Sequence, residues 1–332
     1  MRIAVFGAGR MGGIRVEDLV ANPSVTEVFV TNRTDARAAE LAGQYSATSI
    51  PWSRRNEIVA DGYVIATTTD QHVENLTDVI AHGKPILCEK PISMNLADDG
   101  RIITLANSAG VPIQMAFQRR FDAGIRELHA HIANGSLGTL YAVNMVSHDH
   151  TTPTPEFAAS SGGIFRDLHV HDFDLVRWLT GSEVETAYAT GAVRHVEFLV
   201  PLGDFDTTLI HLVTANGVQV SISGARHDAV GHDVRLEVFG SLDSVTAGVN
   251  RRTPVHPADG DLVFCDPAYT GFIDRFREAF RAETNAFVSL VAGEIENPAP
   301  PSSAREAMRI AIACEESVRT GGPVRVPDIM ST

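Results

Sequence analysis

A glycine-rich segment directly after the first apolar run constrains the fold of this chain more than any other feature. Residues 3–6 are apolar and predict a buried strand, and the next six residues are Gly7-Ala8-Gly9-Arg10-Met11-Gly12. A Gly-x-Gly-x-x-Gly turn between a strand and a helix lets the backbone approach a pyrophosphate, which then faces the helix N-terminus. The pattern predicts a dinucleotide site that includes Gly7, Gly9, Arg10, Met11 and Gly12, with an ordinary glycine loop as the alternative.

Strands and helices alternate through the first third of the chain. Short apolar runs predict strands, and periodic segments that end at Gly, Asn or Pro predict helices. The predicted strands cover residues 3–6, 25–31, 63–66, 86–88 and 112–117, and the predicted helices cover residues 11–20, 36–42, 73–82 and 96–108. This alternation predicts an α/β domain over residues 1–121, built on a doubly wound parallel sheet of the Rossmann type.

The pattern changes after residue 121. Helices are expected at 123–133, 165–179, 271–282 and 303–319, and β-rich runs at 140–148, 183–190, 206–214, 218–225, 234–239 and 244–247. Consecutive β-rich runs joined by short Gly/Asn turns predict an open, mostly antiparallel sheet. We therefore expect a C-terminal α+β domain over residues 122–332. Its last helix, about 303–319, is a candidate to pack back on the first domain.

Composition limits the possible partners. The chain has 332 residues and a net charge of −14, so it offers no excess of basic groups to nucleic acid or to an anionic membrane. Its three cysteines, Cys88, Cys265 and Cys314, form no metal-spaced pair, which favours reduced thiols and no bound metal. No apolar run is long enough to cross a bilayer, and no signal peptide is evident. We expect a soluble, cytoplasmic protein that binds a small molecule.

The end of the second predicted strand bears on the choice between NAD and NADP. An acid about 20 residues after the glycine motif usually holds the ribose 2′-hydroxyl of NAD. Here that position is Asn32, which is followed by Arg33. Because no carboxylate repels a 2′-phosphate and Arg33 can pair with one, the sequence favours NADP or dual use. In the alternative, Asn32 hydrogen-bonds an NAD ribose and Arg33 points into solvent.

A lysine follows the predicted strand at 86–88, within Cys88-Glu89-Lys90-Pro91. This is the carboxyl edge of the predicted parallel sheet, where open α/β sheets bind their ligands. Beside an oxidised nicotinamide, partial burial and the positive ring would ease proton exchange by Lys90 near neutral pH. A surface lysine is the alternative. We also expect cofactor contacts from Glu89, Lys90, Thr67, Thr68, Thr69 and His72.

An acid and a histidine four residues apart lie in the predicted helix at 165–179. Asp167 and His171 would share one face of that helix. A neutral His171 can accept a hydroxyl proton, and Asp167 can orient the substrate or stabilise the imidazolium. The alternative is a core histidine and a helix-start acid. A metal held by His169, His171 and Asp174 is disfavoured, because His169 and His171 diverge on a helix.

These motifs together resemble the Gfo/Idh/MocA family of oxidoreductases over nearly the whole chain. The resemblance also rests on Phe117-Gln118-Arg119-Arg120-Phe121-Asp122, on Gly162-Gly163-Ile164-Phe165-Arg166-Asp167 followed by His171-Asp172-Phe173-Asp174, and on Val238-Phe239-Gly240-Ser241. It implies an enzyme that oxidises a secondary hydroxyl of a cyclic polyol, such as myo- or scyllo-inositol, with NAD or NADP. It also implies a dimer or tetramer that assembles through the open sheet.

The resemblance implies roles for three residues acting together. His171 takes the hydroxyl proton as the hydride leaves for the nicotinamide, Lys90 hydrogen-bonds the reacting oxygen, and Asp167 holds a substrate hydroxyl and His171. His150 and His232 stand where the family pattern suggests asparagine and tyrosine, which leaves the accepted stereoisomer open. For His148 and His150, ordinary strand-end polarity is an equal alternative. The implied substrate-binding residues are Lys90, Gln118, Arg119, His148, His150, Asp167, His171 and His232.

Other activities stay open at this point. A sugar or glycoside dehydrogenase or 3-ketoreductase would use the same Lys90, Asp167 and His171 with different pocket walls. A cofactor that never leaves would indicate an oxidoreductase of the glucose–fructose type. A non-catalytic NADP-sensing protein is a more distant alternative, since a sensor has no need of that trio.

Overall fold

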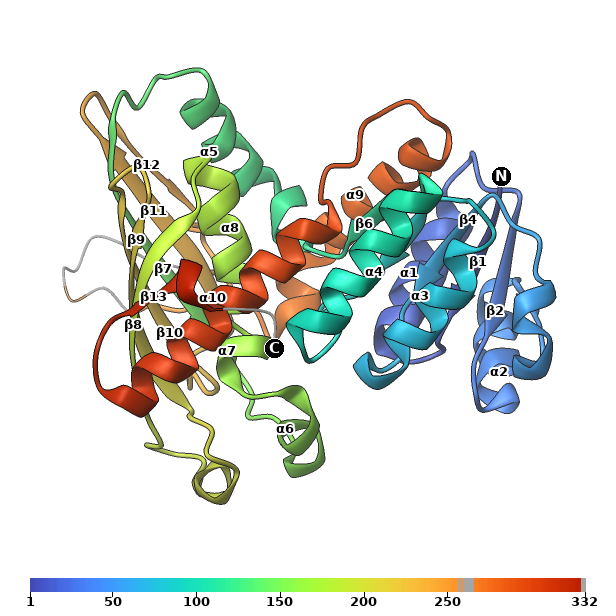
Figure 1. The fold of residues 1–332 in the computed structure, drawn as a ribbon, viewed down its shortest axis with the longest axis horizontal. Helices are drawn as coiled ribbons and strands as arrows, with labels where there is room; N and C mark the ends of the chain where they lie inside the picture. Colours follow the sequence, from blue (N-terminus) through green and yellow to red (C-terminus); the bar gives the residue numbers. More distant parts are fainter. Residues whose placement is uncertain (256–257, 259–265, 330–332) are drawn as a thin grey trace. The chain divides into compact units, whose positions relative to one another are not determined.

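The computed structural model describes residues 1–255, 258 and 266–329 (Figure 1). Cys265 therefore lies outside the described residues. The chain divides into two compact units, of which the first comprises Met1–Phe121 and Glu278–Arg305. The second comprises Asp122–Arg277 and residues 306–329. Helices α9 (Phe272–Val291) and α10 (Pro301–Thr320) thus contribute to both units, and the second unit is not the continuous stretch 122–332.

The first unit contains a six-stranded parallel sheet in the order β3-β2-β1-β4-β5-β6. This strand order is that of dinucleotide-binding α/β folds, and it confirms the predicted fold class. The strands are β1 (Arg2–Phe6), β2 (Glu27–Thr31), β3 (Thr48–Ser49), β4 (Gly62–Ile65), β5 (Ile86–Cys88) and β6 (Ile113–Met115). The helices between them are α1 (Arg10–Ala21), α2 (Asp35–Tyr45), α3 (His72–Ile80) and α4 (Leu96–Ala109).

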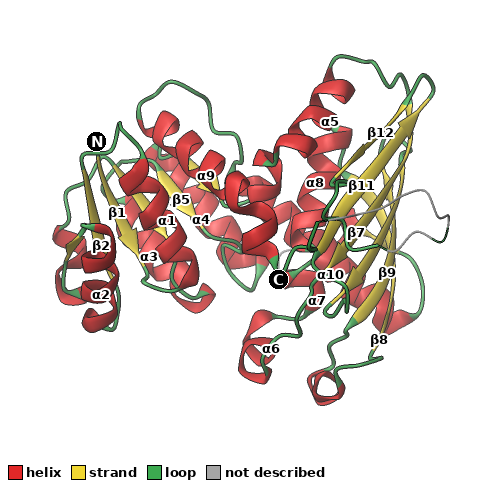
Figure 2. Cartoon of the chain, turned by 180° about the vertical axis from the view of Figure 1, so that it is seen from behind, coloured by secondary structure: helices red, strands yellow, loops and turns green. Residues whose placement is uncertain are grey.

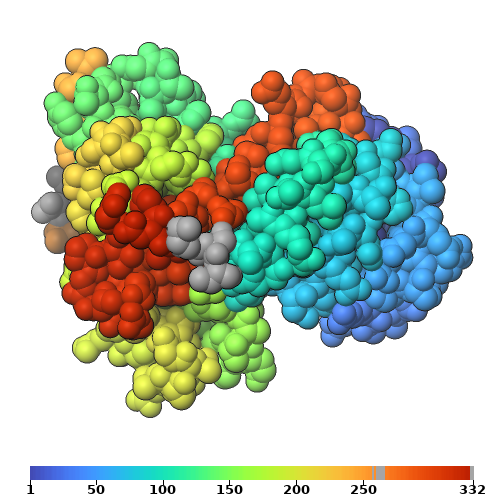
Figure 3. Space-filling model, in the orientation of Figure 1, coloured from blue at the N-terminus to red at the C-terminus, as the bar shows by residue number. Residues whose placement is uncertain are grey.

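One apolar core joins α1, α2 and the second half of α9 to this sheet. Val5 of β1, Val16 of α1 and Phe287 of α9 are buried in it. Gly62 must be small, because a Cβ there would lie 2.6 Å from the side chain of Val291. Helices α3 and α4 contact each other, and both lie on the face of this unit seen in Figure 3. Because the strands β1, β4 and β5 are almost entirely buried, each of them is a nearly continuous apolar run in the sequence.

The start of α4 carries a buried acid. The Asn95 side chain accepts a hydrogen bond from the Asp98 N–H and so caps the helix. The Ser93 hydroxyl donates to Asp99 Oδ1 at 2.6 Å. Asp99 is 1% exposed, and this burial raises the pKa of Asp99 to about 6. The folded chain therefore keeps the Asp99 proton over a pH range in which the unfolded chain has lost it.

Replacing Asp99 with asparagine is expected to stabilise the protein only at higher pH. Since the folded pKa of Asp99 exceeds the value of about 3.9 in unfolded chains, stability falls as pH rises from about 4 to about 6. The amide keeps an acceptor for Ser93 and has no charge to desolvate. We expect Asp99→Asn to add roughly 1–3 kcal/mol to the free energy of unfolding near pH 8 and little near pH 4. Urea unfolding at both pH values measures this change in the free energy of unfolding. An equal change at pH 4 and pH 8 would contradict the prediction.

The second unit contains a seven-stranded sheet in the order β12-β11-β7-β10-β9-β8-β13. All described neighbours are antiparallel except β7 and β10, which are parallel. The predicted open, mostly antiparallel sheet is confirmed. The strands are β7 (Leu140–His148), β8 (Val184–Ala192), β9 (Thr207–Thr214), β10 (Gln219–Ala225), β11 (Asp233–Gly240), β12 (Ser244–Ala247) and β13 (Val324–Arg325).

The described helices of this unit lie on one face of the sheet (Figure 2). Helix α5 (Ala123–Ala133) packs on β12 and on α8 (Val170–Thr180), and α8 packs on β7. Burial alternates along β9 and β10, so one face is core and the other carries exposed side chains. Among the described helices, none is both long and apolar enough to span a membrane.

The predicted single helix at 165–179 is wrong. The structure has α7 (Ile164–Asp167) and α8, separated at Leu168 and His169. The His169 N–H bonds to the carbonyl of Ile164, one residue further back than in a regular α-helix. The His169 ring is fully buried against β10, where a Cβ on Gly224 would lie 2.2 Å from Nε2. Asp167 and His171 therefore do not share one continuous helix, and the spacing argument for a common face fails.

Local signals also missed some elements. Helix α6 (Pro155–Ser161) lies between the predicted strand at 140–148 and the predicted helix at 165–179, and Thr154 caps it. Helix α9 continues well beyond the predicted end at 282. Short 3-10 helices lie at η1 (Trp52–Glu57), η2 (Thr69–Gln71), η3 (Gln118–Phe121), η4 (Glu197–Leu202) and η5 (Val326–Asp328).

Candidate active site

The glycine-rich turn is shaped by close backbone contacts. Gly7 has a φ of 110°, and a Cβ on it would lie 2.4 Å from the carbonyl oxygen of Ala66. A Cβ on Gly12 would lie 2.0 Å from the carbonyl oxygen of Gly7. Gly9, the N-cap of α1, has open space around its Cβ position instead. A tight turn with an open N-terminus fits a dinucleotide pyrophosphate, which Gly7, Gly9, Arg10, Met11 and Gly12 would border.

The Asn32 side chain ties the end of β2 to this turn. Its Oδ1 accepts a hydrogen bond from the Ala8 N–H at 3.1 Å, and its Nδ2 donates to the carbonyl of Thr34 at 3.1 Å. Arg33 is exposed, and its guanidinium lies 3.9 Å from the carboxylate of Glu74 on α3. The turn is therefore held by an amide in the position where NAD-binding folds usually carry an acid.

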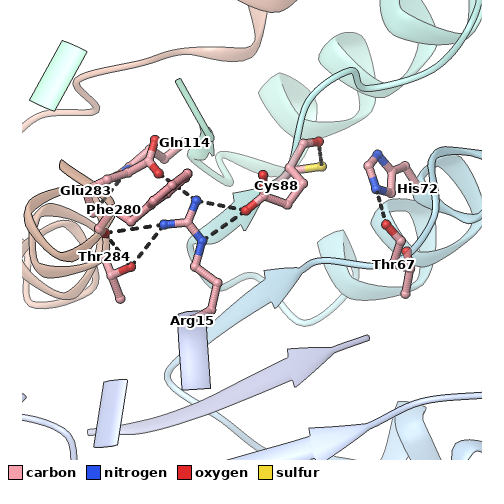
Figure 4. Close-up of polar contacts among 9 residues, drawn as sticks. Arg15, Thr67, His72, Cys88, Gln114, Phe280, Glu283 and Thr284 are labelled. Carbon is pink, nitrogen blue, oxygen red and sulfur yellow. Dashed lines mark hydrogen bonds and ion pairs between the residues drawn. The ribbon is translucent and has the colours of Figure 1, made fainter. Parts of the chain in front are cut away.

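The segment after β4 is fixed to the segment after β5 through His72, whose contact to Thr67 is drawn in Figure 4. The His72 Nδ1 lies 2.8 Å from the carbonyl of Pro91, and its Nε2 lies 3.0 Å from the carbonyl of Thr67. Burial lowers the pKa of His72, so the neutral ring donates to only one of these carbonyls. The Thr67 hydroxyl accepts from Asn75, and the Thr68 hydroxyl accepts from Gln71. Thr69 opens η2.

A buried arginine, Arg15, holds Glu89, the residue before Lys90. Figure 4 labels Arg15 with its partners on α9. Arg15 is fully buried and donates from Nε and Nη2 to Glu89 Oε1 at 3.0 and 2.8 Å. It also donates to Glu283 at 2.6 Å and to the hydroxyl of Thr284 at 3.1 Å, both on α9. Burial would lower the pKa of Arg15, but the carboxylates of Glu283 and Glu89 outweigh it and raise the pKa.

Lys90 sits between two fixed points at the carboxyl end of β5. The Glu89 N–H donates to the carbonyl of Ile65, and the Pro91 carbonyl is the partner of His72. The Lys90–Pro91 peptide bond is cis, and Lys90 is partly exposed. The only other lysine of the chain, Lys84, is exposed before the start of β5.

Two further predicted residues, Gln118 and Arg119, lie in η3 and are 6% and 3% exposed. Their neighbour Arg120 donates to the carbonyl of Pro298 and to the hydroxyl of Ser303. The segment that follows β6 is therefore packed into the first unit.

In the second unit, Asp167 is held by a buried arginine that sequence reasoning missed. Arg226, which is 1% exposed, lies 3.3 Å from Asp167 and 3.2 Å from Asp204. Asp204 in turn accepts from the Ile164 N–H at the start of α7. The neighbouring Arg166 forms a two-bond ion pair with Glu315 of α10. The end of α7 is thus fixed from two sides.

His171 is the second residue of α8 and is partly exposed, whereas His169 is a core side chain. The ring nitrogens of His169 contact Asp172 at 2.8 Å and Thr208 at 2.7 Å, and Asp172 also accepts from Ser147. This network attaches α8 to the sheet. Both ring nitrogens of His169 have partners within the protein, so His169 is a structural residue and is not assigned to the site.

The three other histidines predicted to bind substrate, His148, His150 and His232, gather at one end of the sheet. His148 contacts the carboxylate of Asp228 at 3.1 Å, and His150 contacts the backbone carbonyl of Asp228 at 2.9 Å. His232 is buried, and its Nδ1 lies 3.3 Å from the carboxylate of Asp149. The alignment of the two groups is too poor for a hydrogen bond.

Each unit thus organises its own part of the predicted site. The first holds the glycine turn, Asn32, Lys90, Gln118 and Arg119, and the second holds Asp167, His171 and the three sheet-end histidines. That these two sets meet around one substrate stays a prediction.

A glycine turn on a parallel sheet of this strand order and an appended open sheet define a two-domain nucleotide-dependent oxidoreductase. The chain belongs to the Gfo/Idh/MocA family. Residues 1–117 match the family described as "Oxidoreductase family, NAD-binding Rossmann fold", and residues 125–246 match "GFO/IDH/MocA C-terminal domain". The predicted family is confirmed.

Relatives match over nearly the full length. The chain is 35% identical to myo-inositol dehydrogenase Hyg17 of Streptomyces leeuwenhoekii, covering 97% of this chain and 98% of that one. It is 28% identical to scyllo-inositol 2-dehydrogenase (NAD(+)) of Bacillus subtilis, covering 98% and 96%. The crystal structure of a myo-inositol dehydrogenase from Corynebacterium glutamicum superposes with a TM-score of 0.89 at 30% identity, covering 98% of each chain.

Proposed function

We propose that this protein is an NAD(P)-dependent dehydrogenase that oxidises a secondary hydroxyl of a cyclic polyol, an inositol, to the ketone. The observation that carries the proposal is similarity over both units to relatives named as inositol dehydrogenases. A related activity on a sugar or glycoside is the second candidate, because the same three residues would serve it.

In the proposed reaction a bound nicotinamide nucleotide supplies the hydride acceptor. His171 accepts the proton of the substrate hydroxyl. The carbon that carries this hydroxyl gives up its hydride and becomes the ketone carbon. Lys90 donates a hydrogen bond to the reacting oxygen and offsets negative charge that develops there. Asp167, fixed by Arg226, holds a substrate hydroxyl and stabilises the charged His171 ring.

A substrate panel tests this function. Myo-, scyllo- and chiro-inositol are compared with glucose and xylose, each with NAD⁺ and NADP⁺, by absorbance of the reduced nicotinamide. Turnover of an inositol above the sugars supports the proposal, turnover of sugars alone favours the second candidate, and no turnover with any would overturn both.

The coenzyme proposal is NADP or dual use, supported by Asn32 and Arg33 at the end of β2. Asn32→Asp keeps an acceptor for the Ala8 N–H but places a second oxygen against the Thr34 carbonyl. We expect the carboxylate to turn toward the ribose and to lower the NADP/NAD ratio of kcat/KM about tenfold, since 1.4 kcal/mol is a factor of ten. An unchanged ratio in steady-state assays would contradict the argument.

We also propose that the uncovered face of the second unit's sheet binds a second copy of the chain. Tyr188 and Leu209 are 40% and 62% exposed there, and the family resemblance supports a dimer or tetramer. Light scattering of the purified protein measures its mass in solution, which should be that of a dimer or tetramer. The mass of a single chain would contradict the proposal.

A further inference from the structure

Four charged side chains of the first unit meet beside the end of β2. Glu74, in the first turn of α3, lies 3.9 Å from Arg33 and 3.0 Å from Arg55. Arg55 also lies 3.0 Å from Asp78, one turn further along α3. Arg33 follows Asn32, and so it occupies the region where this fold places the ribose 2′ position of a dinucleotide.

The Glu74 carboxylate is anchored, whereas Arg33 is not held in the same way. Arg55 has a side chain only 16% exposed and stacks over the ring of Trp52 at 4.6 Å, so it provides a fixed partner for Glu74 Oε1. Glu74 also lies at the positive end of the α3 dipole. The Arg33 side chain is 55% exposed, and its contact to Glu74 Oε2 is long. Glu74, whose side chain is itself 55% exposed, therefore places a negative charge that is paired with Arg55 within reach of Arg33.

We propose that Glu74 is a specificity-determining residue that disfavours the 2′-phosphate of NADP. Glu74 lies on α3 and supplies the negative charge that NAD-binding folds usually carry at the end of β2, where this chain has Asn32. Its charge opposes a phosphate beside Arg33, and it competes with that phosphate for the Arg33 guanidinium. NAD has a hydroxyl at this position and is not opposed. The inference rests on the proposed dinucleotide binding and names the residue that limits the NADP preference expected from Asn32 and Arg33.

Glu74→Gln tests the proposal because the amide keeps an acceptor for Arg55 and removes only the charge. Dissociation constants for NADPH and NADH, measured by nucleotide fluorescence without substrate, give the affinity ratio. We expect the ratio to move toward NADPH about fivefold, from the Coulomb energy of like charges several ångströms apart in water. The shift should shrink at about 1 M salt, where the Debye length is about 3 Å.

Asp78→Asn is the matched control, since Asp78 shares Arg55 with Glu74 and no Arg33 contact to it is described. It should leave the ratio within about twofold, because Asp78 lies one turn further along α3 and its carboxylate is paired with Arg55. An unchanged ratio in Glu74→Gln, an equal shift in Asp78→Asn, or a shift insensitive to salt would overturn the proposal. If the protein binds nucleotide but does not turn over a polyol, the proposed substrate is wrong and the role of Glu74 is unaffected. If it binds neither nucleotide, the proposed function and the role of Glu74 are both wrong.

Discussion

Lys90→Ala is expected to lower kcat for inositol oxidation by about 10²-fold or more, with nucleotide affinity largely kept. The ammonium would stabilise the negative charge that develops on the reacting oxygen as the hydroxyl proton leaves for His171, so its loss falls on turnover. His171→Ala should lose a similar factor, because no other group is assigned the hydroxyl proton. Steady-state kinetics and nucleotide titration measure the two effects separately.

The chain supplies a close control for the lysine. Lys84 also precedes a proline, Pro85, and lies before β5 as Lys90 lies after it. Lys84→Ala should leave kcat unchanged, as should His131→Ala on the exposed side of α5. Full turnover in Lys90→Ala or His171→Ala would mean that the site is misassigned.

Arg15→Met is expected to destabilise the first unit by about 3–5 kcal/mol, the usual consequence of removing one partner from a buried ion pair. The substitution leaves the Glu283 carboxylate, which is fully buried, without the guanidinium that now donates to it. It also releases Glu89 and so loosens the peptide that carries Lys90. Urea unfolding followed by circular dichroism gives the loss of stability.

Two comparisons sharpen this result. Arg54→Met removes an exposed pair with Glu57 and should change stability by no more than about 0.5 kcal/mol. Combining Arg15→Met with Glu283→Gln and Glu89→Gln should recover part of the loss, since buried ionic groups can be replaced together at little cost. A loss under about 1 kcal/mol for Arg15→Met alone would show that water reaches the cluster.

The parallel sheet of the first unit could be predicted because its signals are local. Most of its strands contain apolar runs, and glycine, asparagine or proline follows several of them. The two-residue strand β3 (Thr48–Ser49) carries no such signal and was not predicted. The β7–β10 parallel pair could not, because it joins segments more than seventy residues apart with no mark in either. The break between α7 and α8 was missed for a related reason. It depends on the His169 ring reaching Thr208 and on Gly224 leaving room for it.

The candidate site shows the same division. Glycine turns and Glu-Lys-Pro stand out in sequence, whereas Arg15 and Arg226 look like ordinary helix and strand arginines. Their roles come from partners far along the chain, Glu283 and Asp204 among them. Burial of a charge depends on what covers it, and that is a property of the fold.

Two lysines in the whole chain, one at either end of a three-residue strand, make acylation chemistry unusually selective here. Besides the amino terminus, an N-hydroxysuccinimide reagent has only Lys84 and Lys90 to modify. Peptide mass spectrometry can then follow shielding of Lys90 by added nucleotide, with Lys84 as the internal reference, in the unaltered protein.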